Sequence, residues 1–319
     1  QYRVVDPLNA LQDAGLAQSC IVFPVTHSLY RTPTALDITR VNPDRMIVQH
    51  SIGDAHLQLL RDYRKTNPDL FTIQTVDDLF HDLPQKHHLH NYHQREGYVR
   101  MREAMSLCDR VIVSTQPLVD VYGDYCRDVR VMPNCLDDRV WGEFYKTPTP
   151  RSRLRVGWAG AAQHLGDLEM IGEVVARFKD EVDWIFMGMC PDSLRPYIKE
   201  YHPFVSYVDY PAKLASLDLD IAIAPLEDNP FNRCKSNLRL LEYGAMGWPV
   251  VCSDVYPFRT AHPPVLHVPN EKDAWIESVR RLIDDSALRH QMGQQLNQWV
   301  RDNFYLSKNT DKWFSAIFD

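Results

Sequence analysis

Short β-rich runs alternate along this chain with stretches that have the apolar spacing of helices, and this alternation constrains the fold most. In the first half the predicted helices include Ala55–Lys65 and Gln94–Leu107. The predicted strands of that half are Ser19–Phe23, Arg45–Gln49, Leu70–Thr75, Arg110–Ser114 and Val129–Met132. Strands that alternate with helices are typical of βαβ units, whose strands form a parallel sheet.

The alternation restarts after Thr147–Pro150, a TPTP segment that we interpret as a linker. The predicted strands of the second half are Arg153–Trp158, Asp183–Met187, Val205–Val208, Ile221–Ala224 and Val250–Cys252. Its predicted helices are Leu168–Phe178, Ser236–Met246, Asp273–Asp284 and a tail from Ala287 onward. We therefore expect an α/β protein of two Rossmann-like, doubly wound domains, residues 1–150 and 151–319, that face a central cleft. Ligands then bind at the carboxyl ends of the strands.

The start of the chain departs from this plan. Pro7–Gly15 already has the pattern of a helix that ends at a glycine, whereas an α/β domain normally begins with a strand. We therefore expect that a strand precedes Gln1 and that the sequence is part of a longer chain.

Net charge, apolar runs and cysteine spacing argue against a nucleic-acid-binding, membrane-spanning or disulfide-rich protein. A net charge of −7 argues against binding nucleic acid through the overall field of the protein. No run approaches the roughly 18 apolar residues of a membrane span, although contact with a membrane surface stays open. The seven cysteines form no CxxC pair, which favours free thiols in a reducing cytoplasm over a disulfide framework or a structural zinc site.

The segment from Ala224 to Asp254 holds the most informative polar residues. A polar loop follows the predicted strand, and a helix is expected to begin near Ser236. The backbone N–H groups of Ser236, Asn237 and Leu238 would then form an anion site, to which Lys235 adds a positive charge.

Glu242 lies six residues further along this helix, about 9 Å along its axis. That separation suits a phosphate at the helix start and a ribose beside the carboxylate. The plain alternative is a charged helix start and a solvated surface glutamate.

Small residues follow the first predicted strand of the second half, at Gly160, Ala161 and Ala162. They let backbone amides approach a diphosphate, although tight packing alone would also explain them. The loop lacks the GxGxxG pattern, which argues against a nicotinamide cofactor.

Asp77 and Asp78 follow a predicted strand of the first half and are expected to face the cleft. Paired acids there could bind sugar hydroxyls or accept the proton of an acceptor. Alternatively, one of them caps the next turn.

Two further clusters are given structural interpretations. The histidines at positions 87, 88, 90 and 93 have no carboxylate or cysteine at ligand spacing, so we expect no metal site there. Trp275, Val279 and Leu282 form an apolar stripe that predicts core packing.

These motifs resemble those of retaining GT-B glycosyltransferases of the family-4 type. Leu240–Asp254 (LLEYGAMGWPVVCSD) is similar to that family's LEAMAxGxPVV segment, whose glutamate holds the nucleotide ribose, and Glu242 takes that place. Arg155–Ile171 and Asn232–Tyr243 resemble a subgroup with GxxxHxxDL and KSxLKxLEY patterns. In the first half the subgroup patterns YRxxxPxxxL, DVDDxxFxxP, VSTxxLAxxY and VxPNxID have counterparts at Tyr2–Leu11, Thr75–Pro84, Val111–Tyr122 and Val131–Asp138.

The chain departs from the family at the first acid of its Glu-x7-Glu motif. Cys234 stands at that position, which puts the usual contact of this acid with the donor sugar in doubt. Other members also carry a basic pair after the first strand of the C-terminal half, and no Arg or Lys follows Gly160 in that loop. We expect Lys235 to supply this charge instead.

The resemblance implies a hexosyltransferase-type enzyme of polysaccharide biosynthesis that needs no metal and has no tightly bound cofactor. Its donor would be a nucleoside-diphosphate sugar, with UDP- and GDP-sugars favoured, and its acceptor a glycan, a lipid-linked glycan or a protein. Retention would follow from front-face attack, in which the leaving phosphate takes the acceptor proton.

The same resemblance suggests roles for individual residues. Lys235, the amides around Ser236–Leu238 and the Gly160–Ala162 backbone would stabilise the departing diphosphate. His164 would hydrogen-bond the phosphate or the donor sugar. Tyr207, at the start of the Tyr207–Tyr210 segment, would lie beside the base.

Three other functions stay open. The lost acid and the expected truncation fit a catalytically weak, glycosyltransferase-like module that binds a nucleotide or glycan. A GT-B-type sugar epimerase would need more acids and histidines in both halves of the cleft. A phage-type enzyme that glycosylates DNA is disfavoured by the acidic net charge.

Overall fold

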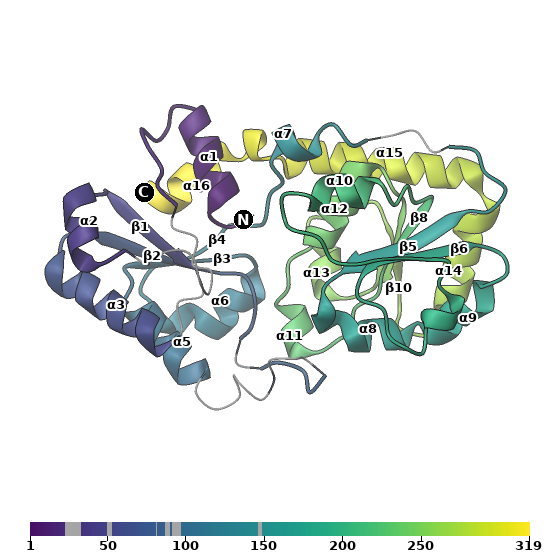
Figure 1. The fold of residues 1–319 in the computed structure, drawn as a ribbon, viewed down its shortest axis with the longest axis horizontal. Helices are drawn as coiled ribbons and strands as arrows, with labels where there is room; N and C mark the ends of the chain where they lie inside the picture. The colour runs from purple at the N-terminus through teal and green to yellow at the C-terminus, as the bar shows by residue number, and fades with distance from the viewer. Residues whose placement is uncertain (23–32, 50–52, 81, 87–89, 91–96, 146–148) are drawn as a thin grey trace.

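The computed structural model describes residues 1–22, 33–49, 53–80, 82–86, 90, 97–145 and 149–319 (Figure 1). It has two lobes, each built on a parallel β-sheet. In the described part of the chain the sheet of the first lobe has the order β1-β2-β3-β4. Its strands are β1 (Arg45–Gln49), β2 (Phe71–Val76), β3 (Arg110–Val113) and β4 (Val129–Val131).

The sheet of the second lobe has the order β10-β9-β8-β5-β6-β7. Its strands are β5 (Arg155–Gly160), β6 (Asp183–Gly188), β7 (Glu200–His202), β8 (Ile221–Ala224), β9 (Val250–Ser253) and β10 (Leu266–Val268). The strands β8 and β9 are fully buried, as expected for a parallel sheet that is covered on both faces.

Alternate residues of each strand of the first sheet pack against different helices. Ile73 and Ile112 point to one face, which is covered by the first and last helices of the chain. Val111 and Val113 point to the other face. The helices of this lobe are α1 (Val5–Asp13), α2 (Ala35–Val41), α3 (Asp54–Thr66), α5 (Gly97–Ser106), α6 (Gln116–Tyr122) and α16 (Thr310–Phe318).

The second sheet is covered in the same way. Trp184 and Phe186 of β6 pack on one face with Trp275, Val279 and Leu282, so the predicted core stripe of this helix is confirmed. The neighbouring β6 residues pack on the opposite face. The helices here are α7 (Asp138–Trp141), α8 (Leu165–Met170), α9 (Gly172–Phe178), α10 (Tyr210–Ala215), α11 (Pro230–Arg233), α12 (Leu238–Met246), α13 (Tyr256–Arg259), α14 (Lys272–Asp284) and α15 (Ser286–Asn303).

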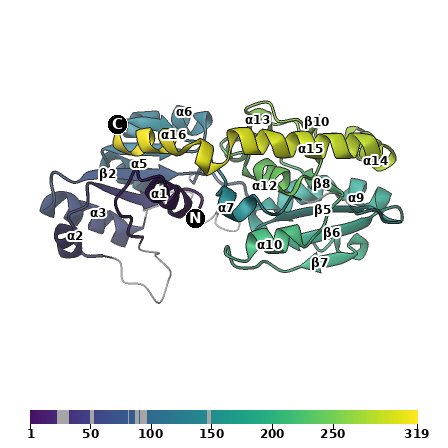
Figure 2. The same ribbon diagram turned by 90° about the horizontal axis from the view of Figure 1, so that it is seen from above.

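The end of the chain returns to the first lobe. Helix α15 runs along the second lobe, and α16 then lies beside α1 (Figures 1 and 2). Trp313 and Ile317 of α16 are buried against Ile73 and Ile112 of the first sheet. The division at residue 150 stays a prediction, and the C-terminal helix shares its core with the N-terminal lobe.

Most predicted strands are confirmed to within a few residues, and three expectations are wrong. Ser19–Val22 has no regular structure, and Phe23 lies outside the described residues. The strand expected at Val205–Val208 lies instead at Glu200–His202, and Val208 is 86% exposed. The helix expected over Leu168–Phe178 is divided between α8 and α9.

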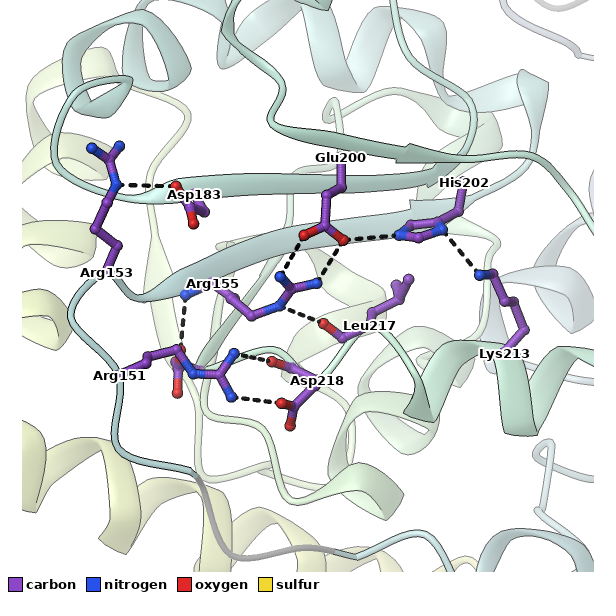
Figure 3. A network of polar contacts seen from close by, with 10 residues as sticks. Arg151, Arg153, Arg155, Asp183, Glu200, His202, Lys213, Leu217 and Asp218 are labelled. Carbon is purple, nitrogen blue, oxygen red and sulfur yellow. Dashed lines mark hydrogen bonds and ion pairs between the residues drawn. The ribbon is translucent and has the colours of Figure 1, made fainter.

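An ion-pair network joins the segment from Arg151 to Arg155 to the rest of the second lobe, as Figure 3 shows. The guanidinium of Arg151, just after the linker, lies 2.6 Å from the Asp218 carboxylate. Arg155 at the start of β5 binds both carboxylate oxygens of Glu200 on β7, at 2.6 and 2.8 Å. The Arg155–Glu200 contact thus connects the first strand of the second lobe, β5, to the edge strand β7.

Replacing Glu200 by glutamine should lower the stability of the protein in a pH-dependent way. Hydrogen bonds from Arg155 lower the pKa of Glu200 to about 2. The ionised form therefore stabilises the fold above the ordinary glutamate pKa of about 4.3, and this contribution is lost as the pH falls towards the folded value. Because the side chain is 37% exposed, we expect a loss of about 1 kcal/mol or less in urea unfolding at about pH 7.

The matched control is Glu277→Gln, at an exposed position of α14. That variant should unfold like the wild type at both about pH 7 and about pH 3. A Glu200→Gln deficit that is as large in acid as at neutral pH would contradict this origin of the stability.

Candidate active site

The candidate site lies where the second sheet changes its direction of winding. From β5 the chain proceeds to β6 on one side, whereas β8 pairs with the other side of β5 and leads to β9. Crevices form at the carboxyl ends of strands at such a switch point. Gly160 at the end of β5, Ala161 after it, and Leu226 after β8 line a cleft of about 300 Å³ there.

The structure brings most of the predicted site residues to this cleft. The predicted residues that line it are Asp77, Asp78, Gly160, Ala161, His164, Tyr207, Lys235, Ser236, Leu238 and Glu242. Two others do not line it: Ala162 is exposed, and Asn237 is a buried residue at the N-cap of α12. Residues from both lobes thus share one cleft, while their roles stay predictions.

Close packing explains two glycines of this cleft. A Cβ at Gly160 would lie 2.5 Å from the Trp158 ring and 2.7 Å from the Arg239 guanidinium. Gly188, at the end of β6, has a φ of +85°, and a Cβ there would lie 2.2 Å from the Gly160 carbonyl oxygen. Gly160 therefore has a packing reason, which is the structural alternative given for it in the sequence analysis.

Helix α12 begins at Leu238, two residues later than expected. Lys235 precedes it, with a side chain that is only 12% exposed. Its ammonium nitrogen lies 3.5 Å from the Asp78 carboxylate and 4.4 Å from the centre of the Phe231 ring. The positive charge expected at the helix start is therefore present, and it faces an acid of the first lobe.

Glu242 is buried rather than solvated, with 7% of its surface exposed. The Tyr2 hydroxyl donates to one carboxylate oxygen at 2.8 Å, and the Tyr210 hydroxyl donates to the other at 3.0 Å. Burial raises the pKa of Glu242 and also raises the pKa of both tyrosines, so the tyrosines stay protonated as donors. The carboxylate is therefore held in place by neutral donors at the wall of the cleft.

Arg239 also lines the cleft, and the sequence analysis missed it. Its guanidinium lies over the Trp158 ring at 4.9 Å and donates to the Ala159 carbonyl oxygen. The spacing could have revealed it, because Arg239 and Glu242 are three residues apart on α12 and such residues share a helix face. Arg239 is therefore a second cation of the cleft, in addition to Lys235.

Cys234, at the position of the family's first acid, does not line the cleft within the described residues. Its side chain is 4% exposed and packs in the core of the first lobe with Phe231, Leu118 and Tyr122. Burial raises the pKa of its thiol to about 11, so the side chain is neutral.

Several contacts between the lobes surround the cleft. The Asn134 side-chain amide donates to the Ser236 hydroxyl at 2.8 Å, and Thr115 donates to the Cys234 carbonyl oxygen at 2.7 Å. Tyr2 packs edge-on against Tyr207, with ring centres 5.1 Å apart. Phe204 also lines the cleft, with 65% of its surface exposed.

The described residues contain neither a metal-ligand cluster nor a helix that could span a membrane. No group of three or more His, Cys, Asp or Glu side chains in them could hold a metal ion. Of the clustered histidines, positions 87, 88 and 93 lie outside these residues, and His90 Nδ1 lies 2.7 Å from the Leu83 carbonyl oxygen. None of the described helices combines the length and the apolar character needed to cross a bilayer.

Comparison with known proteins finds similarity in structure. No family model and no curated protein matches the sequence. Sucrose-phosphate synthase from Thermosynechococcus elongatus matches with a TM-score of 0.64 and 14% identity, over 87% of this chain and 74% of that one. The UDP-forming trehalose-phosphate synthase from Burkholderia xenovorans, in complex with glucose-6-phosphate, matches with 0.62 and 12%, over 88% and 75%. HepE from Anabaena, in complex with UDP, matches with 0.61 and 12%, over 89% and 82%.

The chain has the GT-B fold. The expected α/β architecture of two Rossmann-like units is therefore confirmed. In this GT-B structure the cleft contains the buried carboxylate of Glu242 and two cations, Lys235 just before α12 and Arg239 on it, with paired acids from the first lobe.

Replacing Glu242 by glutamine should leave the protein at least as stable as the wild type at about pH 8. A carboxyl whose pKa is raised in the folded state costs stability as the pH rises above its unfolded value, and glutamine removes that charge. The difference in melting temperature should vanish near the ordinary glutamate pKa of about 4.3.

Glu181→Gln should behave in the opposite way, because hydrogen bonds from Arg280 lower the pKa of Glu181. A Glu242→Gln protein that is less stable than the wild type at about pH 8 would show that the ionised carboxylate contributes to folding.

Proposed function

We propose that this protein is a glycosyltransferase that takes its sugar from a nucleoside-diphosphate donor bound against the second lobe. The observation that carries this proposal is the arrangement of α12 and of the residue Lys235 that precedes it. Lys235, Arg239 and Glu242 all line one cleft at the switch point of the sheet. Cations suit a diphosphate, and a buried carboxylate suits the two hydroxyls of a ribose.

Cleavage of the donor places negative charge on the departing diphosphate. The anomeric C–O bond breaks and the acceptor oxygen bonds to the same carbon, while the acceptor proton passes to the leaving phosphate. Lys235 and Arg239 would stabilise the charge that develops, which is the largest contribution expected from this site. The reaction would then need no metal, and attack on the face of the leaving group would retain the anomeric configuration, as in the family-4 enzymes that the sequence resembles.

The acceptor would approach from the first lobe. Asp77 and Asp78 line the cleft from that side, and Asp78 faces Lys235 across it. A carboxylate there could accept a hydrogen bond from the attacking hydroxyl and orient it. A glycan, a lipid-linked glycan or a protein would each offer such a hydroxyl.

The base would lie near the aromatic side chains at the mouth of the cleft. Phe204 is exposed and Tyr207 also lines the cleft, so either ring could stack on a base. UDP and GDP sugars are the favoured donors, and the complex of the structurally similar HepE with UDP supports a uridine nucleotide.

A screen of nucleotides by thermal stabilisation should locate the donor site. We expect one of UDP, GDP, dTDP, CMP and ADP to stabilise the wild type by about 2.7 kcal/mol when its concentration is about 100 times its dissociation constant. That stabilisation corresponds to a few degrees in melting temperature for a chain of this size. Lys235→Ala, Arg239→Ala and Glu242→Ala should each remove most of the shift.

The matched control is Arg233→Ala. Arg233 is also a cation that precedes α12, but its side chain is 57% exposed and pairs with Asp228 outside the cleft lining. This variant should respond to the nucleotide like the wild type. If no nucleotide shifts the wild type, or if the cleft variants respond as Arg233→Ala does, the assigned donor site is wrong.

One observation favours a second function, that of a binding module with little or no catalysis. The position of the family's first acid is occupied by the buried, neutral Cys234. Incubation with the sugar derivative of the nucleotide that binds should separate the two functions. An enzyme should release the free nucleoside diphosphate, with or without acceptor, and should lose this activity in Lys235→Ala. Binding without release would support the module.

A further inference from the structure

Three polar side chains form a continuous chain from the wall of the second lobe to the cleft. The Asp167 carboxylate lies 2.7 Å from His164 Nδ1, and His164 Nε2 lies 3.0 Å from the Arg239 guanidinium. His164 is 6% exposed and Asp167 is 3% exposed. Both nitrogens of the buried imidazole are therefore engaged by its two neighbours.

The identity of the neighbours determines which nitrogen of His164 carries the proton. A guanidinium has only N–H donors, so Nε2 must be the acceptor of the Arg239 contact. The proton then lies on Nδ1, which donates to the Asp167 carboxylate. Asp167 thus selects the tautomer in which His164 presents a lone pair to Arg239.

Asp167 is itself held in position. Its other carboxylate oxygen accepts from the Glu227 backbone N–H at 2.7 Å and from the Asn232 side-chain amide at 3.1 Å. Both donors belong to the segment between β8 and α12. Asp167 therefore cannot move without breaking contacts to the loop that forms one side of the crevice, and its contact with Nδ1 in turn orients the imidazole.

Arg239 has a long side chain that would otherwise sample many conformations. Trp158 supports the face of the guanidinium, the Ala159 carbonyl oxygen accepts one N–H, and His164 accepts another. A guanidinium has five N–H donors, so these contacts still leave donors for a ligand in the cleft that Arg239 lines. Fixing such a side chain in advance removes much of the entropy cost of binding.

We infer that His164 is a positioning residue, which holds the Arg239 guanidinium in place for the donor diphosphate instead of contacting the donor itself. This inference rests on the proposed function. It assigns His164 a role different from the direct hydrogen bond to the phosphate or sugar that the sequence resemblance suggests. In this arrangement His164 acts only through Arg239.

A double-mutant cycle tests the inference, with dissociation constants measured by calorimetry for UDP and, in parallel, for GDP and dTDP. His164→Leu keeps a similar volume but removes the acceptor, and Arg239→Ala removes the guanidinium. Each single variant should weaken binding of the nucleotide that the wild type prefers by about ten-fold or more, as expected for a charge-assisted contact. The double variant should bind within about two-fold of Arg239→Ala alone, because His164 has nothing left to position.

Two conservative variants separate positioning from a general structural role. His164→Gln should retain binding to within about three-fold, because its amide oxygen can accept from Arg239. Asp167→Asn places an amide N–H opposite Nδ1 and should move the imidazole proton to Nε2, which then opposes the Arg239 donors. Histidine ¹⁵N spectra should show that change of tautomer, and the variant should weaken binding only while Arg239 is present.

The outcomes distinguish this inference from the proposed function. If the wild type binds none of these nucleotides, the donor site fails and the inference fails with it. If the wild type binds but the losses from His164→Leu and Arg239→Ala multiply, His164 contacts the ligand directly. If His164→Leu binds like the wild type, or fails to fold while His164→Gln and Asp167→Asn fold and bind normally, Arg239 needs no positioning by His164.

Discussion

The arrangement of the cleft depends on the docking of residues 231–236 against the first lobe. Phe231 and Cys234 are buried in the core of that lobe, and Thr115 donates to the Cys234 carbonyl oxygen. Because α12 begins directly after this segment, the docking places Lys235 opposite Asp78. The contact that joins the two lobes therefore also brings a cation of the second lobe, Lys235, close to an acid of the first, Asp78.

The site combines charged groups that are costly to bury with neutral groups that hold them. Glu242 is held by two tyrosine hydroxyls, one from each lobe, and Arg239 by a carbonyl oxygen, an indole ring and an imidazole. Neutral partners orient a charge without cancelling it, so both groups keep most of their attraction for a ligand. Lys235 differs in this respect, because Asp78 already offsets part of its charge. Proteins commonly place such desolvated, pre-oriented charges where they bind substrates.

The alternation of strands and helices could be predicted because periodicity is local. Strands such as Arg45–Gln49 and Ile221–Ala224 agree with the structure residue for residue. Local patterns failed where the sheet ends: the edge strand Glu200–His202 was placed too late, and β10 at Leu266–Val268 was not anticipated. Short edge strands carry weak patterns, because only one side of each strand pairs and its residues are partly exposed.

The residue types of the site were determined by the sequence, whereas their partners were decided by the tertiary structure. A cation before a helix and a glutamate along it can be read from spacing alone, because a helix has a fixed rise per residue. Three features depend on contacts between positions up to 240 residues apart: the packing of Cys234 in the first lobe, the burial of Glu242 between Tyr2 and Tyr210, and the contact of His164 with Arg239. Contacts of that kind depend on how two lobes and several loops pack together, and no local pattern in the chain encodes that packing.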